Sequence, residues 1–243
     1  MDEQRRIVAI LDDALEGIAT AKANAEKNLL NARELFVGLL KSVFARTGEG
    51  WSVTRVGAVA NCCLGKMLDK AKNKRDPRPY LRNLNVRWFE FDLADLEEMR
   101  FAPGEYERHS VRQGDVVICE GGYPGRAAIW GGPEPIFIQK ALHRVRFEDA
   151  VVGRWFLYYL YAQEASGALR QHFTGTGIQH FTGAALSRLE LPLAPCAVTA
   201  SLVNRFDALA ADVLRFESIY CRKLAALADL KRSLLHQAFS GSL

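Results

Sequence analysis

The segment EQRRIVAILDDALEGIATAKANAEKNLLNARELF (residues 3–36) determines how the N-terminal part of this chain folds. It contains no proline and a single glycine, Gly17. Its apolar residues recur in steps of four and three, the heptad pattern of a coiled-coil helix, with one extra step of four that forms a stutter. The seam consists of Ile7, Leu11, Ala14, Ile18, Ala21, Ala25, Leu29, Ala32 and Phe36. This pattern predicts a long helix over residues 1–47.

The C-terminal part repeats this pattern. Its apolar residues follow the same steps, with the stutter at the same place, at a constant offset of 195 residues. They are Leu202, Phe206, Leu209, Val213, Phe216, Tyr220, Leu224 and Leu227. The same offset pairs Leu35 with Leu230 and Phe44 with Phe239. We interpret the two ends as a diverged internal repeat and predict a second long helix over residues 196–243.

Helices of this length extend beyond what one domain needs for its own core, because about 43 residues span roughly 65 Å. Two interpretations remain open: a helical hairpin that buries its own seam, or a coiled-coil spacer that also packs against another chain. We favour the second. If the repeats pair in matched register, small residues face large ones. The small ones are Ala14, Ala21, Ala25 and Ala32, and the large ones are Leu209, Phe216, Tyr220 and Leu227.

Composition places the 243-residue chain among ordinary globular proteins, with 49% hydrophobic and 25% charged residues. No apolar run approaches the roughly 18 residues that a membrane span requires, and the N-terminus has no signal-peptide core. The five cysteines are odd in number and form no CxxC motif, so we expect neither a disulfide framework nor a zinc ribbon. We expect a cytoplasmic protein that does not associate with a membrane.

Between the two helices the composition changes, since all eight prolines lie between Pro77 and Pro195. We predict a separate domain over residues 48–195. The expected strands are 51–59, 86–91, 115–119, 126–130 and 135–140, and the expected buried helix is 149–164. The predicted fold is therefore a mixed α/β (α+β) domain flanked by two long antiparallel coiled-coil helices.

Positive charge is concentrated in KMLDKAKNKRDPRPYLR (residues 66–82). This segment contains seven basic and two acidic residues, which gives it a net charge of +5, whereas the whole chain carries +4. Such a run is commonly a solvated loop. Here it is interleaved with Tyr80, Asn83 and Trp88, and basic and amide side chains of this kind contact phosphates and base edges. Nucleic acid is therefore a candidate partner.

Motifs for catalysis are lacking. The run 76–80 (DPRPY) resembles a loop of adenine methyltransferases, but Arg78 interrupts it. The glycine-rich turn 120–126 lacks the spacing of a phosphate-binding loop, and the five histidines lack metal-ligand spacing. We interpret Cys119, at the end of an expected strand, as a buried structural thiol. We expect no enzyme activity and no metal site.

Several phrases resemble the specificity subunits of type I restriction–modification enzymes. Residues 3–36 resemble the conserved helical region of that family. The phrases that resemble its target recognition domain are PYLRNLNV (79–86), GDVVICEGGYPGRAAIW (114–130) and FTGTGIQHFTGAALSRLELPL (173–193). LELPLAP (189–195) resembles the phrase before a conserved helix, and LADLKRSLLHQAFSG (227–241) is similar to the end of the family's C-terminal helix. These phrases cover nearly the whole chain in the family's order.

The resemblance implies a chain that performs no chemistry and binds no cofactor of its own. Family members select the sequence of double-stranded DNA and hold two methyltransferase subunits, which use S-adenosylmethionine to methylate an adenine in each half of a bipartite target. An endonuclease/translocase subunit can join them. Family members carry two recognition domains, whereas this chain has one, and residues 196–201 depart from the family's "EQQR" phrase. The resemblance therefore implies a half-subunit that forms a homodimer through its long helices and reads a palindromic bipartite target.

Three loops are the candidate DNA-binding sites. The first contains Lys72, Lys74, Arg75, Arg78, Tyr80, Arg82 and Asn83; we expect its lysines to contact phosphates. The second contains Tyr123 and Arg126, and the third contains Thr174, Thr176, Gln179 and His180. Arg126 and Gln179 have side chains suited to bidentate contacts with guanine and adenine.

Structural roles remain open for the same residues. Tyr123 would then cap its turn, Arg126 would pair with Glu120, and Gln179 would bond a loop carbonyl. The alternative function is a coiled-coil scaffold or DNA-binding regulator outside restriction–modification.

Overall fold

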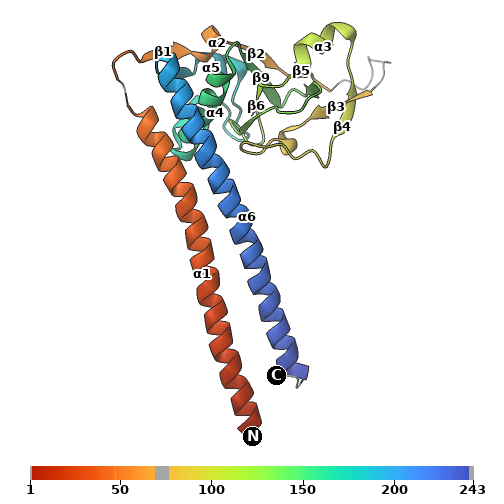
Figure 1. Cartoon of the computed structure of the whole chain (residues 1–243). Coiled ribbons are helices and arrows are strands. Elements are labelled where there is room, and N and C mark those ends of the chain that lie inside the picture. Colours follow the sequence, from red (N-terminus) through yellow and green to blue (C-terminus); the bar gives the residue numbers. More distant parts are fainter. Residues whose placement is uncertain (1, 47, 69–76, 241–243) are drawn as a thin grey trace. The chain divides into compact units, whose positions relative to one another are not determined.

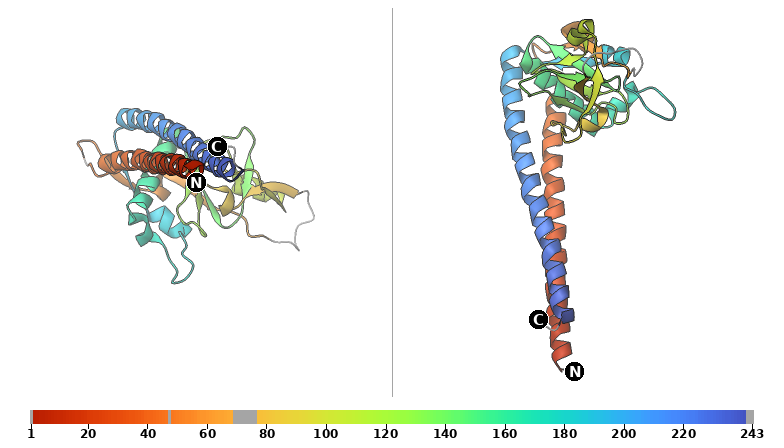
Figure 2. Two further views of the ribbon diagram at one scale, coloured as in Figure 1. Left: turned by 90° about the horizontal axis from the view of Figure 1, so that it is seen from below. Right: turned by 90° about the vertical axis from the view of Figure 1, so that its right-hand side faces the viewer.

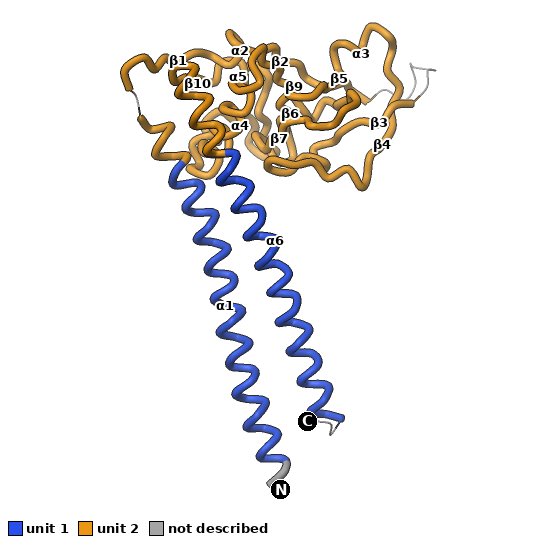
Figure 3. Tube along the Cα trace, viewed as in Figure 1, with its two compact units in different colours: residues 1–39, 207–243 blue, residues 40–206 orange. Residues whose placement is uncertain are grey.

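The computed structural model describes residues 2–46, 48–68 and 77–240. Contacts divide the chain into two compact units (Figure 3). Unit 1 contains residues 1–39 and 207–243, and unit 2 contains residues 40–206. Two helices contribute to both units: α1 (Asp2–Phe44) and α6 (Cys196–Ser240).

Unit 1 consists of the long parts of α1 and α6, which lie side by side (Figures 1 and 2). The predicted seam of α1 is confirmed, since each of its residues is buried or half-buried. Ile18, Ala25 and Phe36 are the most buried of them. The helices are joined by a hydrogen bond from Asn28 Nδ2 to Tyr220 Oη at 3.1 Å.

The seam of α6 departs from the prediction at one position. Phe216 is 45% exposed, whereas Glu217 is half-buried and forms an ion pair with Arg33 at 2.6 Å. The matched register, in which each residue of α1 would face the residue 195 positions later, is wrong. The residues in contact are 192 positions apart in the Asn28–Tyr220 hydrogen bond and 184 positions apart in the Arg33–Glu217 ion pair. A matched register would give the same difference at both contacts.

The described residues of unit 2 form three small sheets (Figure 1). One is the antiparallel pair of β1 (Ser52–Arg55) and β10 (Glu190–Leu193), which joins the beginning and end of the domain. An antiparallel sheet has the order β2 (Ala60–Leu64), β9 (Leu142–Phe147), β6 (Val116–Cys119), β7 (Ala127–Ile129). A mixed sheet has the order β4 (Glu97–Arg100), β3 (Pro77–Leu81), β8 (Ile136–Ile138), β5 (Ser110–Val111). In the mixed sheet, β3 and β8 are parallel.

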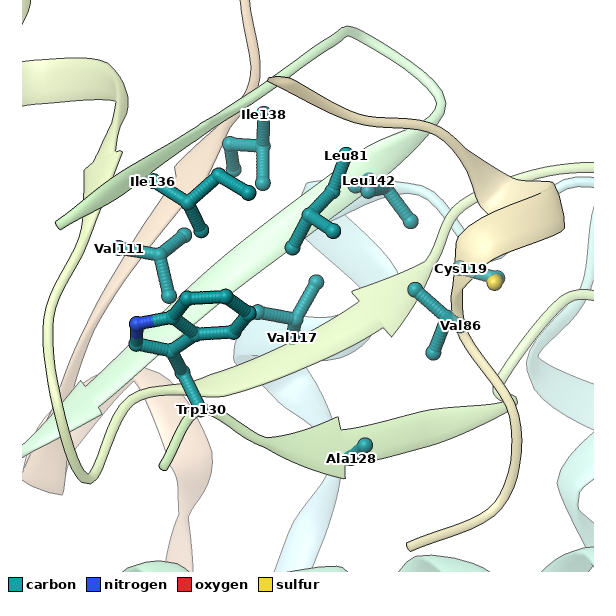
Figure 4. Close-up of a cluster of buried hydrophobic side chains, with 10 residues drawn as sticks. All are labelled: Leu81, Val86, Val111, Val117, Cys119, Ala128, Trp130, Ile136, Ile138 and Leu142. Atoms are coloured by element: carbon teal, nitrogen blue, oxygen red, sulfur yellow. The ribbon is translucent and has the colours of Figure 1, made fainter. Parts of the chain in front are cut away.

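The two four-stranded sheets share a core (Figure 4). Alternate residues of β6, Val117 and Cys119, point into it with Ile136 and Ile138 of β8. Trp130 closes the cluster, and its indole nitrogen donates to the carbonyl of Glu134 at 3.0 Å, so its one polar group is satisfied. The two sheets are thereby packed together through one apolar core.

Helix α4 (Ala150–Ala165) is the buried helix of unit 2, as predicted. Asp149 begins it by accepting a hydrogen bond from the amide of Val151 at 2.8 Å. The fully buried Trp155 packs against Phe44 and Phe206, and its indole nitrogen donates to the carbonyl of Pro192 at 2.7 Å. Helix α4 therefore holds the end of α1 and the beginning of α6 within unit 2.

The short helices connect these elements. They are α2 (Val56–Val59), η1 (Asn83–Asn85), α3 (Pro103–His109), η2 (Ala168–His172) and α5 (Gly183–Arg188). Within the described ranges, no helix has an apolar stretch long enough to cross a bilayer.

Three of the five expected strands are confirmed: 115–119, 126–130 and 135–140 correspond to β6, β7 and β8. The expected strand 51–59 is wrong in its second half, where the chain forms α2. The expected strand 86–91 is also wrong. There the amide of Arg87 donates to the carbonyl of Glu90 at 2.9 Å, and Phe89 adopts φ +67°. The aromatic contacts of Phe89 with Tyr158 and Tyr161 favour this turn over an extended strand.

Candidate nucleic-acid interface

The turn between β6 and β7 has a backbone that only glycine accommodates at two positions. Gly122 and Gly125 have φ of +77° and +87°. A Cβ at Gly122 would lie 2.1 Å from Asn83 Nδ2, and one at Gly125 would lie 2.4 Å from Leu169 Cδ2. Neighbouring elements therefore pack directly against the turn and hold it in one conformation.

This turn presents Tyr123 to solvent. Tyr123 is 51% exposed, and the guanidinium of Arg126 lies over its ring, 3.7 Å from the centroid. Arg126 Nη2 also donates to the carbonyl of Asn83 at 2.9 Å. Arg126 thus supports Tyr123 and the backbone of η1 in this conformation. It does not pair with Glu120, whose carboxylate contacts His180.

The third predicted loop, residues 174–180, is a short hairpin that projects from the rest of unit 2, coloured teal in Figure 2. The amides of Thr174 and His180 donate to each other's carbonyls at 2.9 and 2.8 Å. Gly175 has φ +105°, and a Cβ there would lie 2.2 Å from the carbonyl oxygen of Ile178. At the tip, Ile178 is 73% exposed, and Thr176 and Gln179 are also exposed.

A contact between Glu120 and His180 joins the second loop to the third. Glu120 Oε2 lies 3.0 Å from His180 Nδ1, and the amide of Phe181 donates to the carbonyl of Glu120 at 2.7 Å. The loops around Tyr123 and Gln179 are therefore one surface. Within the described part of the chain, no hydrogen bond of the Gln179 side chain is present.

A cavity of about 510 Å³ lies between these loops and helix η2. Tyr123, Arg126 and Gln179, all predicted site residues, line it. It is also lined by Trp88, Gly122, Pro124, Glu164, Leu169, Arg170 and Phe173. The sequence prediction missed Trp88, Glu164, Arg170 and Phe173 as site residues. Only Trp88, next to the basic run, gave any signal.

The first predicted loop is divided by the structure. Lys72, Lys74 and Arg75 lie outside the described residues. Arg78 is exposed on β3, where it remains a candidate for phosphate contact.

Three other members of the first loop have structural contacts that do not fit a direct DNA contact. Tyr80 is 2% exposed, and its hydroxyl donates to Glu97 Oε2 at 2.7 Å. Arg82 forms ion pairs with Asp95 and Glu97. The Asn83 side chain donates to the carbonyl of Gly121 at 3.3 Å. Burial and the neighbouring Glu97 raise the pKa of Tyr80 to about 12, so the hydroxyl remains a donor.

Cys119 is a structural thiol in this fold, as predicted. It is fully buried, and burial raises its pKa to about 11. A thiol in this state is a weak nucleophile at neutral pH. No group of three or more His, Cys, Asp or Glu side chains within residues 2–46, 48–68 and 77–240 is arranged to hold a metal ion.

Comparison with known proteins identifies the class to which this fold corresponds. No protein-family model matches the sequence, and no curated protein matches it. One match is a chain from a structural study of the type I restriction–modification (R-M) system, which concerns its complex assembly and conformational transition. The TM-score is 0.81 and the sequence identity is 22%. The match covers 99% of this chain and 60% of that one. The HsdS subunit of Thermoanaerobacter tengcongensis matches with a TM-score of 0.65 and 22% identity, over 100% of this chain and 59% of that subunit.

The chain therefore has the fold of type I R-M specificity subunits. It spans about 60% of the length of these two structures.

Proposed function

We propose that this protein is a non-catalytic specificity subunit of a type I R-M system and that unit 2 reads one half of a bipartite DNA target. The observation that carries the proposal is the structural match to a type I R-M chain over 99% of this chain. The exposed hairpin 174–180 and its neighbouring turn supply a surface suited to a DNA groove.

Within this surface the side chains divide by their chemistry. The exposed Gln179 suits bidentate contact with adenine, and Thr174 and Thr176 suit single hydrogen bonds to base edges. Arg78, with Lys72, Lys74 and Arg75 of the neighbouring basic run, suits phosphates, which fix the protein on the duplex and make its affinity salt-dependent. His180 acts through Glu120, since that contact holds the hairpin in place.

Unit 1 is proposed to be an antiparallel coiled coil that sets the distance between two recognition domains. The contacts Asn28–Tyr220 and Arg33–Glu217 support this direction, since one residue number rises as the other falls. In such a pair, Arg33 and Glu217 lie on one side of the seam.

The opposite side of the seam carries three exposed apolar residues. At 100° per residue, Leu35, Phe216 and Ile219 fall there, and all three are exposed within unit 1. Phe216 and Ile219 are about 4.5 Å apart along α6, given 1.5 Å rise per residue. The two contacts place Leu35 within about 5 Å of the level of Phe216 and about 6–9 Å from that of Ile219. We propose that this patch packs against the same patch of a second copy, which gives a homodimer with two identical recognition domains.

The proposed partners perform the chemistry. Methyltransferase subunits would supply S-adenosylmethionine and the methyl transfer, and an endonuclease/translocase subunit would supply cleavage. This chain would contribute DNA sequence recognition and a scaffold. Two identical domains related by a twofold axis would read a palindromic bipartite sequence.

The test is to co-express the chain with the methyltransferase subunit encoded beside it and to map methylated adenines across the host genome. A palindromic, two-part motif is the expected result. A non-palindromic motif would show that a different chain supplies the second recognition domain. If the two proteins bind each other and no motif appears, the recognition proposal fails. If they do not bind each other, a scaffold or regulator outside restriction–modification becomes the better explanation.

A further inference from the structure

We propose that the cavity beside Tyr123 binds a nucleobase that has left the DNA stack, with the Tyr123 ring as its stacking surface. This inference rests on the proposed function, because it presumes that unit 2 contacts DNA. It adds a second kind of contact to the groove-reading hairpin.

The Tyr123 ring is prepared for one-sided stacking. Arg126 lies over one face of the ring, 3.7 Å from its centroid, while Tyr123 as a whole is 51% exposed. A guanidinium on one face leaves the other for an aromatic ligand. Every nucleobase has a π-face, so stacking of this kind tolerates any base.

The backbone fixes the ring before any ligand arrives. Gly122 and Gly125 hold positive φ on either side of Tyr123, and Asn83 and Leu169 fill the space that side chains at these glycines would occupy. A preorganised ring loses little conformational freedom on binding.

A second aromatic residue reaches the cavity from a strained turn. Trp88 lines the cavity, and the following residue, Phe89, has φ +67°, which is unfavourable for a phenylalanine. Backbone strain of this kind persists where the surrounding structure enforces it, and it concentrates at binding sites. Contacts of Phe89 with Tyr158 and Tyr161 provide that enforcement.

Polar groups around the cavity match a nucleotide. Arg170 carries a positive charge suited to a phosphate, and Glu164 and Gln179 provide acceptors and a donor for a base edge. The volume of about 510 Å³ is within the range of small-ligand sites, which favour apolar walls with a few polar groups. Gln179 belongs to both the cavity and the hairpin, so an extruded base would remain next to the groove contacts.

The experiment uses the full chain and two short duplexes of the same sequence. One is fully paired, and the other carries a single unpaired 2-aminopurine as a bulge. We expect about tenfold tighter binding of the bulged duplex, with a decrease in 2-aminopurine fluorescence as the base stacks. In Tyr123→Leu both effects should disappear, and in Tyr123→Phe both should persist.

Phe239→Leu is the matched control, since it also replaces an exposed aromatic ring by leucine, outside the cavity, and it should behave as the wild type. Equal binding of the two duplexes by the wild type would overturn the cavity proposal and leave groove recognition intact. A bulge preference that persists in Tyr123→Leu would also overturn it. Failure to bind either duplex at low salt would overturn both this inference and the proposed function.

Discussion

The ring of Phe44 lies edge-on to the indole of Trp155, with centroids 4.6 Å apart and an interplanar angle of 62°. Tyr159 contacts the same phenylalanine at 5.3 Å. The internal repeat equates Phe44 with Phe239, which is 89% exposed. Two repeat-equivalent residues therefore have opposite environments, because only Phe44 lies against the aromatic cluster of α4.

Phe44→Ala should lower the free energy of unfolding by about 3 kcal/mol, since it leaves a cavity beside a fully buried tryptophan. Phe239→Ala should change it by less than about 0.5 kcal/mol. Chemical denaturation monitored by tryptophan fluorescence measures both. Equal effects would mean that Phe239 is covered in solution.

Gly175→Ala should disrupt the hairpin without unfolding the domain. Its φ of +105° and the 2.2 Å approach of the Ile178 carbonyl oxygen exclude a Cβ. Because the loop is exposed, the melting temperature should stay near that of the wild type, while discrimination between target and non-target DNA falls by about tenfold. Competition binding assays measure this.

Gly177→Ala is the control for this experiment, because nothing lies within 4 Å of its Cβ position. It should retain discrimination. If Gly175→Ala also retains it, the hairpin does not read the target.

Much of the fold could be predicted from periodic patterns, and the exceptions have local causes. The α1 seam is buried as predicted because heptad spacing specifies a face regardless of what covers it. The pattern failed at Phe216, because the neighbouring Glu217, which pairs with Arg33, occupies the seam instead. It also failed at residues 86–91, where aromatic packing of Phe89 outweighs the preference of an apolar run for a strand.

The site was less predictable, because the sequence does not reveal which charged side chains form ion pairs with each other in the fold. Arg82 belongs to a basic run, yet it forms ion pairs with Asp95 and Glu97, 13 and 15 residues further along the chain. Arg170 and Phe173 enter the cavity only through the placement of η2 after α4. No local motif marks either residue.

Substitutions of Arg78 and Arg82 should distinguish a residue that contacts DNA from one that stabilises the fold. Arg82→Met should lower the free energy of unfolding by about 1–2 kcal/mol, because Asp95 and Glu97 lose a shared partner. Arg78→Met should leave stability unchanged and reduce the slope of log affinity against log salt by about 0.9, the value for one phosphate contact. Titrations between about 50 and 200 mM salt measure the slope. An unchanged slope in Arg78→Met would exclude this phosphate contact.

Acid should destabilise unit 2 through His143. This residue is 1% exposed, and burial lowers its pKa below the ordinary value, although its contact with the Phe181 carbonyl at 2.8 Å opposes the shift. The unfolded chain therefore binds a proton more readily than the folded one. Stability should fall as the pH drops below about 6.5, by at most about 1.4 kcal/mol per pH unit for this histidine, until the folded pKa is passed.

His143→Gln should reduce the steepness of this loss while keeping a donor for the Phe181 carbonyl. His236→Gln, on the exposed surface of α6, is the matched control. Denaturation series at pH 5 to 8 measure the difference. An equally steep loss in His143→Gln would assign the effect to another group, with the buried His109 as the next candidate, since burial also lowers its pKa.

The proposed dimer depends on one side of the helix pair. Lysines in a Leu35→Lys, Phe216→Lys double variant would place charge in the apolar patch and should give a monomer in analytical ultracentrifugation. Leu30→Lys is the matched control. Leu30 is 55% exposed, and heptad geometry places it on the other side of the seam, with Arg33 and Glu217. The Leu30→Lys variant should remain dimeric.

Dissociation in Leu30→Lys alone would place the interface on the side of the seam with Arg33 and Glu217, and a monomeric wild type would exclude self-association through unit 1. Both variants retain the hairpin 174–180, so DNA binding by the monomer should persist with about half the salt slope.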